Sequence, residues 1–156
     1  MEFLLDTANL TAISNALGLY PIDGVTTNPS ILAKEAPDDV WAHLKAIQQL
    51  IGLQRSLHFQ VLSETAEGMI EEAKVLRQHL GHTVFVKIPA TPQGLKAMKH
   101  LHAQGVRVTA TAIYSKLQAV LAINAGADYV APYVNRMENL DVDAMEVISA
   151  ISTTIP

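Results

Sequence analysis

A lysine stands among strand-forming apolar residues in the segment TVFVKIPAT at 83–91. The six other lysines of the chain fall on segments with helical spacing, where a solvated ammonium group is expected. Burial of an unpaired ammonium group costs on the order of several kcal/mol, or the group loses its proton instead. A desolvated neutral amine attacks carbonyl groups and forms Schiff bases. The segment therefore allows two interpretations of Lys87. It is either a nucleophile or a structural residue, and a structural lysine would form an ion pair with Asp6 or reach water from an edge strand.

Polar residues recur near the carboxyl ends of the segments expected to be strands. These segments are residues 3–6, 24–28, 56–62, 83–89, 106–113 and 129–134. Their polar residues are Asp6, Asn28, Gln60, Lys87, Thr111 and Tyr133. In a barrel of parallel strands these ends converge on one mouth, where active sites form. We therefore interpret the six as one candidate site, although Asp6 could instead cap a helix that follows it.

Amphipathic stretches alternate with these strands and predict crossover helices. They cover residues 38–52, 63–81, 91–105, 115–126 and 141–156. Their expected N-caps and glycine C-caps are Asp38, Ser63, Thr91, Ser115, Gly81, Gly105 and Gly126. A strand–helix unit repeated about six times requires a parallel sheet in an α/β fold, within a single domain over residues 1–156.

Two architectures fit this pattern: a doubly wound open sheet and a (β/α)₈ barrel. The first expected strand is followed by DTANL, without a GxGxxG motif, and a GxxxxGK[ST] motif is also missing from the sequence. The common nucleotide-binding signatures of open sheets are therefore absent. Together with the polar residues at the strand ends, this favours the barrel.

Composition excludes several classes of function. The formal net charge is −4 and no run of Lys and Arg occurs, which argues against binding to nucleic acid or anionic membranes. The sequence contains no cysteine, so disulfides and cysteine nucleophiles are excluded. No apolar run reaches the roughly 18 residues of a membrane span. The histidines lack metal-ligand spacing, so we expect no metal site. We also expect no cofactor, and we expect a cytoplasmic protein.

Several segments together are similar to the transaldolase-like family of small class I aldolases. They are LDTAN at 5–9, GVTTNPSI at 24–31, TAEGM at 65–69, VKIP at 86–89 and YVAPYVNR at 129–136. The resemblance runs from residue 1 to the last residue. It implies an enzyme on a TIM barrel that acts on a sugar phosphate through a Schiff base.

The resemblance also implies a role for each candidate residue. Lys87 would form the Schiff base with a donor such as dihydroxyacetone, and Asp6 would assist the proton transfers. Thr26 and Asn28 would bind the substrate, and Arg136 would meet its phosphate group. These roles suit imine chemistry, which needs a neutral amine and acid–base help for the loss of water.

Two residues separate the two activities of this family. Transaldolases typically carry a glutamate on the third strand and a phenylalanine on the sixth, whereas this sequence has Gln60 and Tyr133. With Thr111, these side chains could hold a water molecule and relay its proton. The resemblance thus favours cleavage of fructose 6-phosphate to dihydroxyacetone and glyceraldehyde 3-phosphate. The alternatives are a transaldolase that transfers the dihydroxyacetone unit, or an inactive truncated scaffold protein.

The length departs from the family pattern. A complete barrel has eight βα units and roughly 200 residues or more, whereas 156 residues supply about six units. We therefore expect a truncated chain that is weakly stable and poorly active when isolated, with open strand edges. The resemblance further implies a homo-oligomer, a decamer in the relatives.

Overall fold

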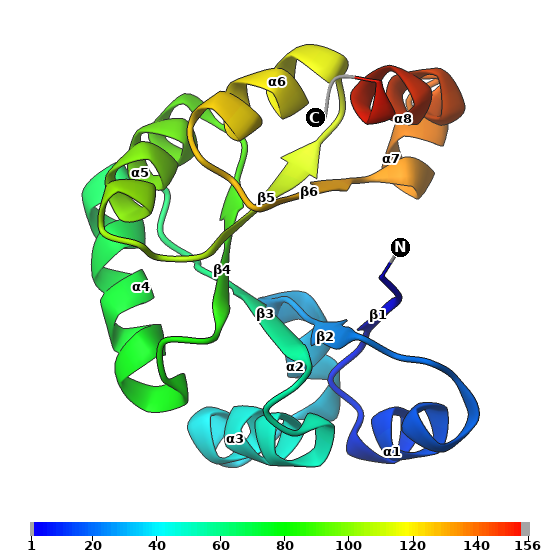
Figure 1. Ribbon diagram of the computed structural model, residues 1–156, viewed down its shortest axis with the longest axis vertical. Helices are drawn as coiled ribbons and strands as arrows, with labels where there is room; N and C mark the ends of the chain where they lie inside the picture. Colours follow the sequence, from blue (N-terminus) through cyan, green and yellow to red (C-terminus); the bar gives the residue numbers. More distant parts are fainter. Residues whose placement is uncertain (1, 154–156) are drawn as a thin grey trace. The chain divides into compact units, whose positions relative to one another are not determined.

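Strands and helices alternate along a computed structural model that describes residues 2–153 (Figure 1). The strands are β1 (Leu4–Asp6), β2 (Gly24–Thr26), β3 (Ser56–Gln60), β4 (Phe85–Pro89), β5 (Val108–Ile113) and β6 (Tyr129–Pro132). The helices are α1 (Leu10–Leu19), α2 (Pro29–Glu35), α3 (Val40–Ile51), α4 (Ala66–Leu80), α5 (Pro92–Ala103), α6 (Lys116–Asn124), α7 (Val134–Glu138) and α8 (Ala144–Ser152).

The order of the strands decides between the two predicted architectures. The sheet runs β1-β2-β3-β4-β5-β6, in the order of the chain. A doubly wound sheet reverses its strand order at a switch point, whereas a barrel adds each strand beside the one before it. The α/β fold of the TIM-barrel class, with six βα units, is therefore confirmed.

All six predicted strands are present. The repeated strand–helix unit predicted a helix after the first strand, which is α1, whereas the helices α2 and α7, of seven and five residues, were not predicted. Such short helices carry too few residues for a helical period to be visible in the sequence. Among the predicted N-caps, Thr91 and Ser115 are confirmed, whereas Asp39 caps α3 in place of Asp38. The predicted end of the last helix at 154–156 lies outside the described residues.

The described chain falls into two compact units, which we treat separately. The first unit comprises the described part of residues 1–62 together with 72–86, and the second comprises 63–71 together with the described part of 87–156. The boundary crosses α4 and β4, so that Val86 belongs to the first unit and Lys87 to the second. That residues 1–156 form a single domain stays a prediction.

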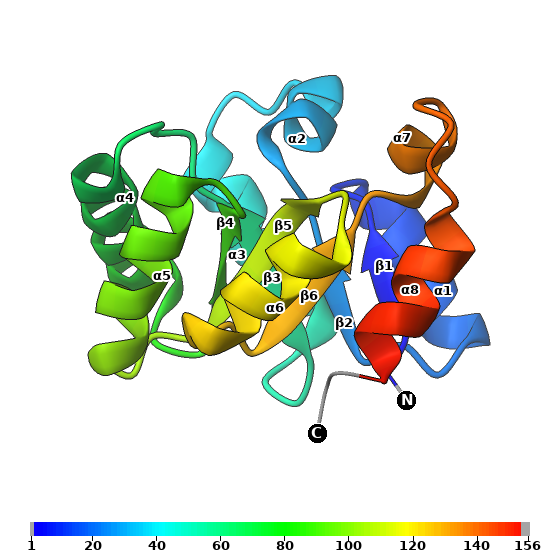
Figure 2. The ribbon, with the colours of Figure 1, turned by 90° about the horizontal axis from the view of Figure 1, so that it is seen from above.

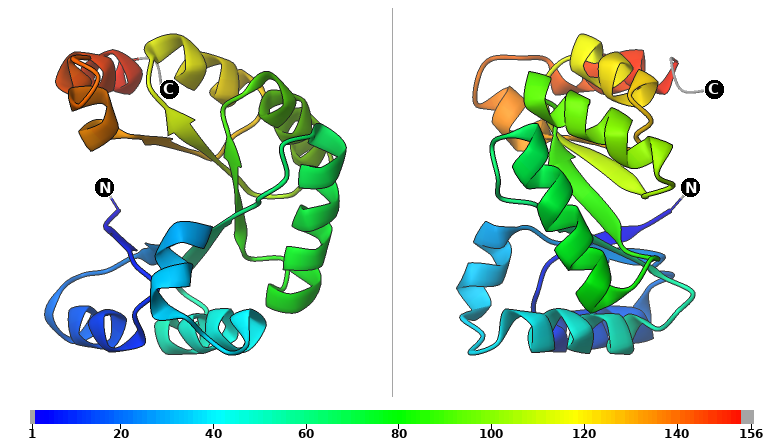
Figure 3. Two further views of the ribbon diagram at one scale, coloured as in Figure 1. Left: turned by 180° about the vertical axis from the view of Figure 1, so that it is seen from behind. Right: turned by 90° about the vertical axis from the view of Figure 1, so that its left-hand side faces the viewer.

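In the first unit, β1, β2 and β3 pair in parallel and are covered by helices. Val25 pairs with both Leu5 and Leu57, and Val25 and Leu57 are buried. Helices α1 and α3 pack against each other, as Figure 3 shows. Their buried residues, Ile13 on α1 and Leu44 on α3 among them, form the core of this unit. Removal of these apolar surfaces from water stabilises the unit.

In the second unit, β5 and β6 pair in parallel with one irregularity. Ala110 pairs with Val130, but the next pair joins Ile113 to Pro132, so β5 carries one extra residue. This β-bulge contains Ala112, whose φ of 55° is left-handed and unfavourable for a residue with a Cβ atom. Helix α6 packs on β5 and against α8, as Figure 2 shows for the two helices.

The connection from β4 to α5 is held by specific hydrogen bonds and by a close approach. The Ala90 N–H donates to the Thr111 carbonyl oxygen at 2.8 Å, which ties the end of β4 to β5. The Thr91 hydroxyl oxygen accepts from the Gly94 N–H at 3.0 Å and caps α5. A Cβ atom at Gly94 would overlap the Pro89 carbonyl oxygen. The chain therefore requires glycine there to start α5 so soon after β4.

We predict that Gly94→Ala destabilises the protein, because a methyl group would force backbone atoms apart. The expected loss in free energy of unfolding is about 1–3 kcal/mol, measured by urea denaturation. Gly18→Ala on α1 is the matched control, since a Cβ atom there meets nothing within 4 Å. That control should be neutral or stabilising by up to about 1 kcal/mol. Equal stability of the two variants would contradict the close approach at Gly94.

Candidate active site

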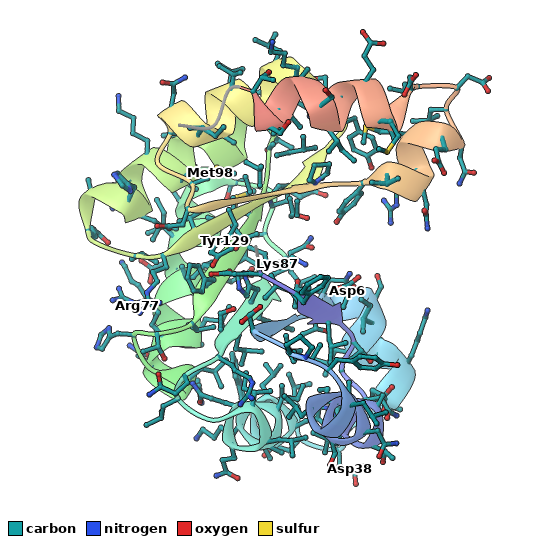
Figure 4. The ribbon with its side chains drawn as sticks, turned by 45° about the vertical axis from the view of Figure 1, so that its right-hand side comes forward. Asp6, Asp38, Arg77, Lys87, Met98 and Tyr129 are labelled. Carbon is teal, nitrogen blue, oxygen red and sulfur yellow. The ribbon has the colours of Figure 1, made fainter. Side chains whose placement is uncertain are left out.

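Lys87 lies in the middle of β4 with its side chain almost completely buried. The residue is 4% exposed, and its neighbours Val86 and Ile88 are fully buried. Strands of parallel α/β sheets are covered on both faces, which explains this continuous burial. The lysine that the sequence placed among strand residues is therefore a buried amine, labelled in Figure 4. Burial favours the neutral form of an amine, which is the nucleophilic form.

Thr111 and Tyr133 come together in the same unit as Lys87. Thr111, on β5, is fully buried, and its hydroxyl group donates to the Tyr133 hydroxyl oxygen at 3.1 Å. The Tyr133 backbone N–H donates to the Ile113 carbonyl oxygen at 3.0 Å, just beyond the bulge. A phenol that accepts this bond keeps its own proton to donate, as an acid–base group needs.

Arg136 lies on α7, one helical turn after Tyr133, and stacks on the Tyr133 ring. Its guanidinium carbon is 4.9 Å from the ring centroid. The Tyr114 ring also contacts Tyr133, edge to face, with 5.7 Å between ring centroids and planes at 73°. A side-chain hydrogen bond with Tyr114 is the largest cause that raises the pKa of Arg136. Arg136 is thus a cation held against two phenols.

Tyr114 is the site residue that the sequence analysis missed. It follows β5 directly, three residues after Thr111, and is half-buried. Its position could have indicated a site residue, because Tyr114 follows the carboxyl end of the strand that carries Thr111, and active sites of barrels form at these ends. Tyr114 lies one residue beyond the strand predicted at 106–113, so the sequence assigned it to the connection that follows.

Asp6 and Thr26 end two neighbouring strands of the first unit. They are paired in the sheet, Asp6 exposed and Thr26 half-buried. The alternative that Asp6 caps the next helix is wrong, because Asn9 does so. The Asn9 Oδ1 atom accepts from the Ala12 N–H at 2.8 Å, and α1 begins only at Leu10. The Asp6 carboxylate is therefore not needed to start a helix.

Asn28 has a structural role as the N-cap of α2. Its Oδ1 atom accepts from the Ile31 N–H at 2.9 Å. This bond uses the oxygen of the side-chain amide and orients the group, while the two amide hydrogens take no part in it. Asn28 can therefore cap the helix and offer hydrogen-bond donors at the same time.

Two buried oxygens of the first unit lack a hydrogen-bond partner. They are Gln60 Oε1, at the end of β3, and Thr27 Oγ1, directly after β2. An unsatisfied buried polar group costs roughly 1–3 kcal/mol, so such a group calls for an explanation, such as local strain, a catalytic role or a bound water. Gln60 thus offers an acceptor of the kind the predicted water relay requires. The sequence analysis did not single out Thr27.

The predicted residues therefore divide between the units. The second unit brings together Thr111, Tyr133 and Arg136 and contains Lys87, whose strand is tied to Thr111 through Ala90. The first unit contains the remaining candidates, Asp6, Thr26, Asn28 and Gln60.

Residues 2–153 contain neither a candidate metal site nor a helix that could span a membrane. Within this range, no group of three or more histidine, aspartate or glutamate side chains is arranged to hold a metal ion. None of the helices described there combines the length and the apolar character that crossing a membrane requires.

Solved structures with a related fold have low sequence identity. A structure described as "Native KDPGal structure" matches with a TM-score of 0.61 and 14% identity, over 98% of this chain and 66% of that one. A mandelate racemase/muconate lactonizing protein from Paracoccus denitrificans, complexed with magnesium, matches with a TM-score of 0.52 and 16% identity. That match covers 83% of this chain and 39% of the other. Both likenesses concern the fold alone.

Sequence relatives give the family. A Streptococcus pneumoniae protein named "Probable fructose-6-phosphate aldolase" is 45% identical over 155 residues, which is 99% of this chain and 70% of the relative. Residues 3–155 also match the family described as Transaldolase/Fructose-6-phosphate aldolase. The chain therefore belongs to the transaldolase/fructose-6-phosphate aldolase family.

Proposed function

We propose that this protein is a class I aldolase that reversibly cleaves fructose 6-phosphate through a Schiff base on Lys87. The observation that carries the proposal is a buried lysine in the same unit as a threonine–tyrosine hydrogen bond. Lys87 is 4% exposed, and Thr111 Oγ1 lies 3.1 Å from the Tyr133 hydroxyl. The site therefore offers a buried amine, whose neutral form burial favours, and a positioned acid–base group, two requirements of imine catalysis.

The reaction begins with attack of the Lys87 Nζ atom on C2 of fructose 6-phosphate. The carbinolamine that forms takes up a proton on its hydroxyl group and loses water, leaving an iminium ion. The positive nitrogen then accepts the electron pair of the C3–C4 bond. Covalent catalysis of this kind divides one difficult step into easier ones.

Bond cleavage needs a base at the C4 hydroxyl group. Removal of that proton forms the aldehyde of glyceraldehyde 3-phosphate as the C3–C4 bond breaks and an enamine remains on Lys87. Protonation of the enamine at C3 and hydrolysis of the resulting iminium release dihydroxyacetone and restore the amine. We assign the proton transfers to Tyr133, directly or through a water molecule, because Thr111 fixes its hydroxyl group.

Family resemblance supplies the remaining assignments. Asp6 would take part in proton transfer, Gln60 would hold a water molecule, and Thr26 and Asn28 would bind donor hydroxyl groups. Arg136, exposed on α7, would bind the phosphate group. We extend the proposal to a cytoplasmic, homo-oligomeric enzyme that needs no cofactor.

Transaldolase activity is the second candidate, because the family includes both reactions. In that reaction the enamine attacks an aldose-phosphate acceptor and is not protonated by the enzyme. A glutamine at position 60 and a phenol at position 133 favour aldol cleavage, since the phenol can supply the proton. A phenylalanine there could not.

Trapping with borohydride tests the Schiff base. We expect dihydroxyacetone and borohydride to add one reduced dihydroxyacetone unit to Lys87, located by peptide mass spectrometry. Lys87→Met should abolish this adduct. Lys96→Met is the matched control, because Lys96 is exposed and pairs with Glu67 at 2.6 Å. An adduct confined to other lysines, or no adduct with a folded protein, would refute the proposal and favour a non-catalytic scaffold.

Dependence on an acceptor separates aldolase from transaldolase. We expect fructose 6-phosphate to be cleaved without an added aldose phosphate, and Tyr133→Phe to lower kcat by roughly 10²-fold or more. The adduct on Lys87 should still form in this variant, because the amine is unchanged. Tyr20→Phe, at an exposed tyrosine of the first unit, is the control. Turnover that requires an acceptor would instead establish the transaldolase reaction.

A further inference from the structure

Tyr114 takes no part in the mechanism above, yet its backbone is fixed on both sides. It follows the bulge at Ala112 and precedes Ser115, the N-cap of α6. Its N–H donates to Gln118 Oε1 at 2.9 Å, and the Gln118 Nε2 donates to the Ala90 carbonyl oxygen at 3.3 Å. The position of Tyr114 is therefore set by the same connections that join the end of β4 to β5.

The Tyr114 side chain contacts both Tyr133, the proposed acid–base group, and Arg136, the proposed phosphate-binding group. Its ring meets the Tyr133 ring edge to face, an arrangement that stabilises a pair of aromatic rings beyond the area it buries. Its phenolic oxygen accepts a hydrogen bond from the Arg136 guanidinium group. Arg136 also covers the Tyr133 ring at 4.9 Å. The three side chains form one cluster, which we call the Tyr114–Tyr133–Arg136 cluster.

The cluster matters because Arg136 is exposed. A free arginine side chain loses rotamer entropy when a bound anion orders it, and this loss weakens binding. A hydrogen bond to a fixed phenol and a stacked ring restrict the guanidinium group before any ligand arrives. Such preorganisation increases affinity by lowering the cost of ordering.

We propose that Tyr114 is a positioning residue with two separable functions. Its hydroxyl group holds Arg136 for the phosphate group of the substrate, and its ring holds the Tyr133 phenol against Thr111. The inference rests on the proposed function, since it takes Arg136 as the phosphate-binding group and Tyr133 as the acid–base group. It makes Tyr114 a determinant of preference for phosphorylated over neutral aldehydes.

Two variants separate the two functions. Tyr114→Phe removes only the hydroxyl group, so KM for glyceraldehyde 3-phosphate in aldol addition with dihydroxyacetone should rise about 3- to 30-fold. Its kcat should stay within about twofold, and addition to unphosphorylated glyceraldehyde should be unchanged. Tyr114→Leu also removes the ring, so kcat should fall with both aldehydes. A purely structural role would instead affect both aldehydes equally in both variants.

Control variants test whether the changes in KM and kcat arise from the contacts of Tyr114. Tyr20→Phe should match the wild-type protein with both aldehydes, and urea denaturation of every variant verifies folding. In the Arg136→Ala background, Tyr114→Phe should add no further increase in KM, because the group it holds is gone. Additive effects of the two substitutions, or an unchanged KM in Tyr114→Phe, would overturn the inference.

Measuring the affinity for the aldehyde without catalysis tests the role of Tyr114 independently of the proposed reaction. In Lys87→Met, which cannot form a Schiff base, calorimetry can compare glyceraldehyde 3-phosphate with glyceraldehyde. Tyr114→Phe in that background should weaken binding of the phosphorylated aldehyde alone by about 3- to 30-fold. Equal binding with and without the Tyr114 hydroxyl would refute the inference. Loss of the borohydride adduct at Lys87 with phosphate affinity intact would instead refute only the proposed function.

Discussion

Burial of the Lys87 amine is the constraint on which the proposed chemistry depends. A parallel strand covered on both faces removes the group from water, and the side chain is 4% exposed between two fully buried residues. Desolvation penalises the ammonium form and leaves the amine available to a carbonyl carbon. The cost of a polar group in this position is offset only if its surroundings are polar as well. Thr111 and Tyr133 lie in the same unit as Lys87 and are joined by a hydrogen bond between their hydroxyl groups.

A bulge in the neighbouring strand positions Tyr133, the proposed acid–base group. The extra residue on β5 places Ala112 at a φ of 55°, a conformation that an alanine rarely adopts. Bulges of this type re-aim side chains next to active sites. Here the residues on either side of Ala112 hold Tyr133, through the Thr111 hydroxyl and the Ile113 carbonyl group. Strain at one residue thus accompanies a fixed position for the phenol.

The sequence was sufficient to predict the repeated strands and the buried lysine, but not the local irregularities of the backbone. Alternation of strand and helix predicted six strands, and the lone lysine at position 87 stood out because charge in a strand is rare. No glycine in the sequence marks the bulge at Ala112. Tyr114 was missed because it lies one residue beyond the strand predicted at 106–113. Asp6 was open to two interpretations until Asn9 proved to be the helix cap, because both residues suit an N-cap equally.

The central claim is a covalent bond between Lys87 and a ketone, and isotope-edited NMR observes that bond without chemical reduction. The protein would carry ¹⁵N at lysine Nζ and be saturated with dihydroxyacetone labelled with ¹³C at the carbonyl carbon. We predict a one-bond carbon–nitrogen correlation that disappears in Lys87→Met and persists in Lys96→Met. A folded, saturated protein without this correlation, or a correlation that survives in Lys87→Met, would contradict the account.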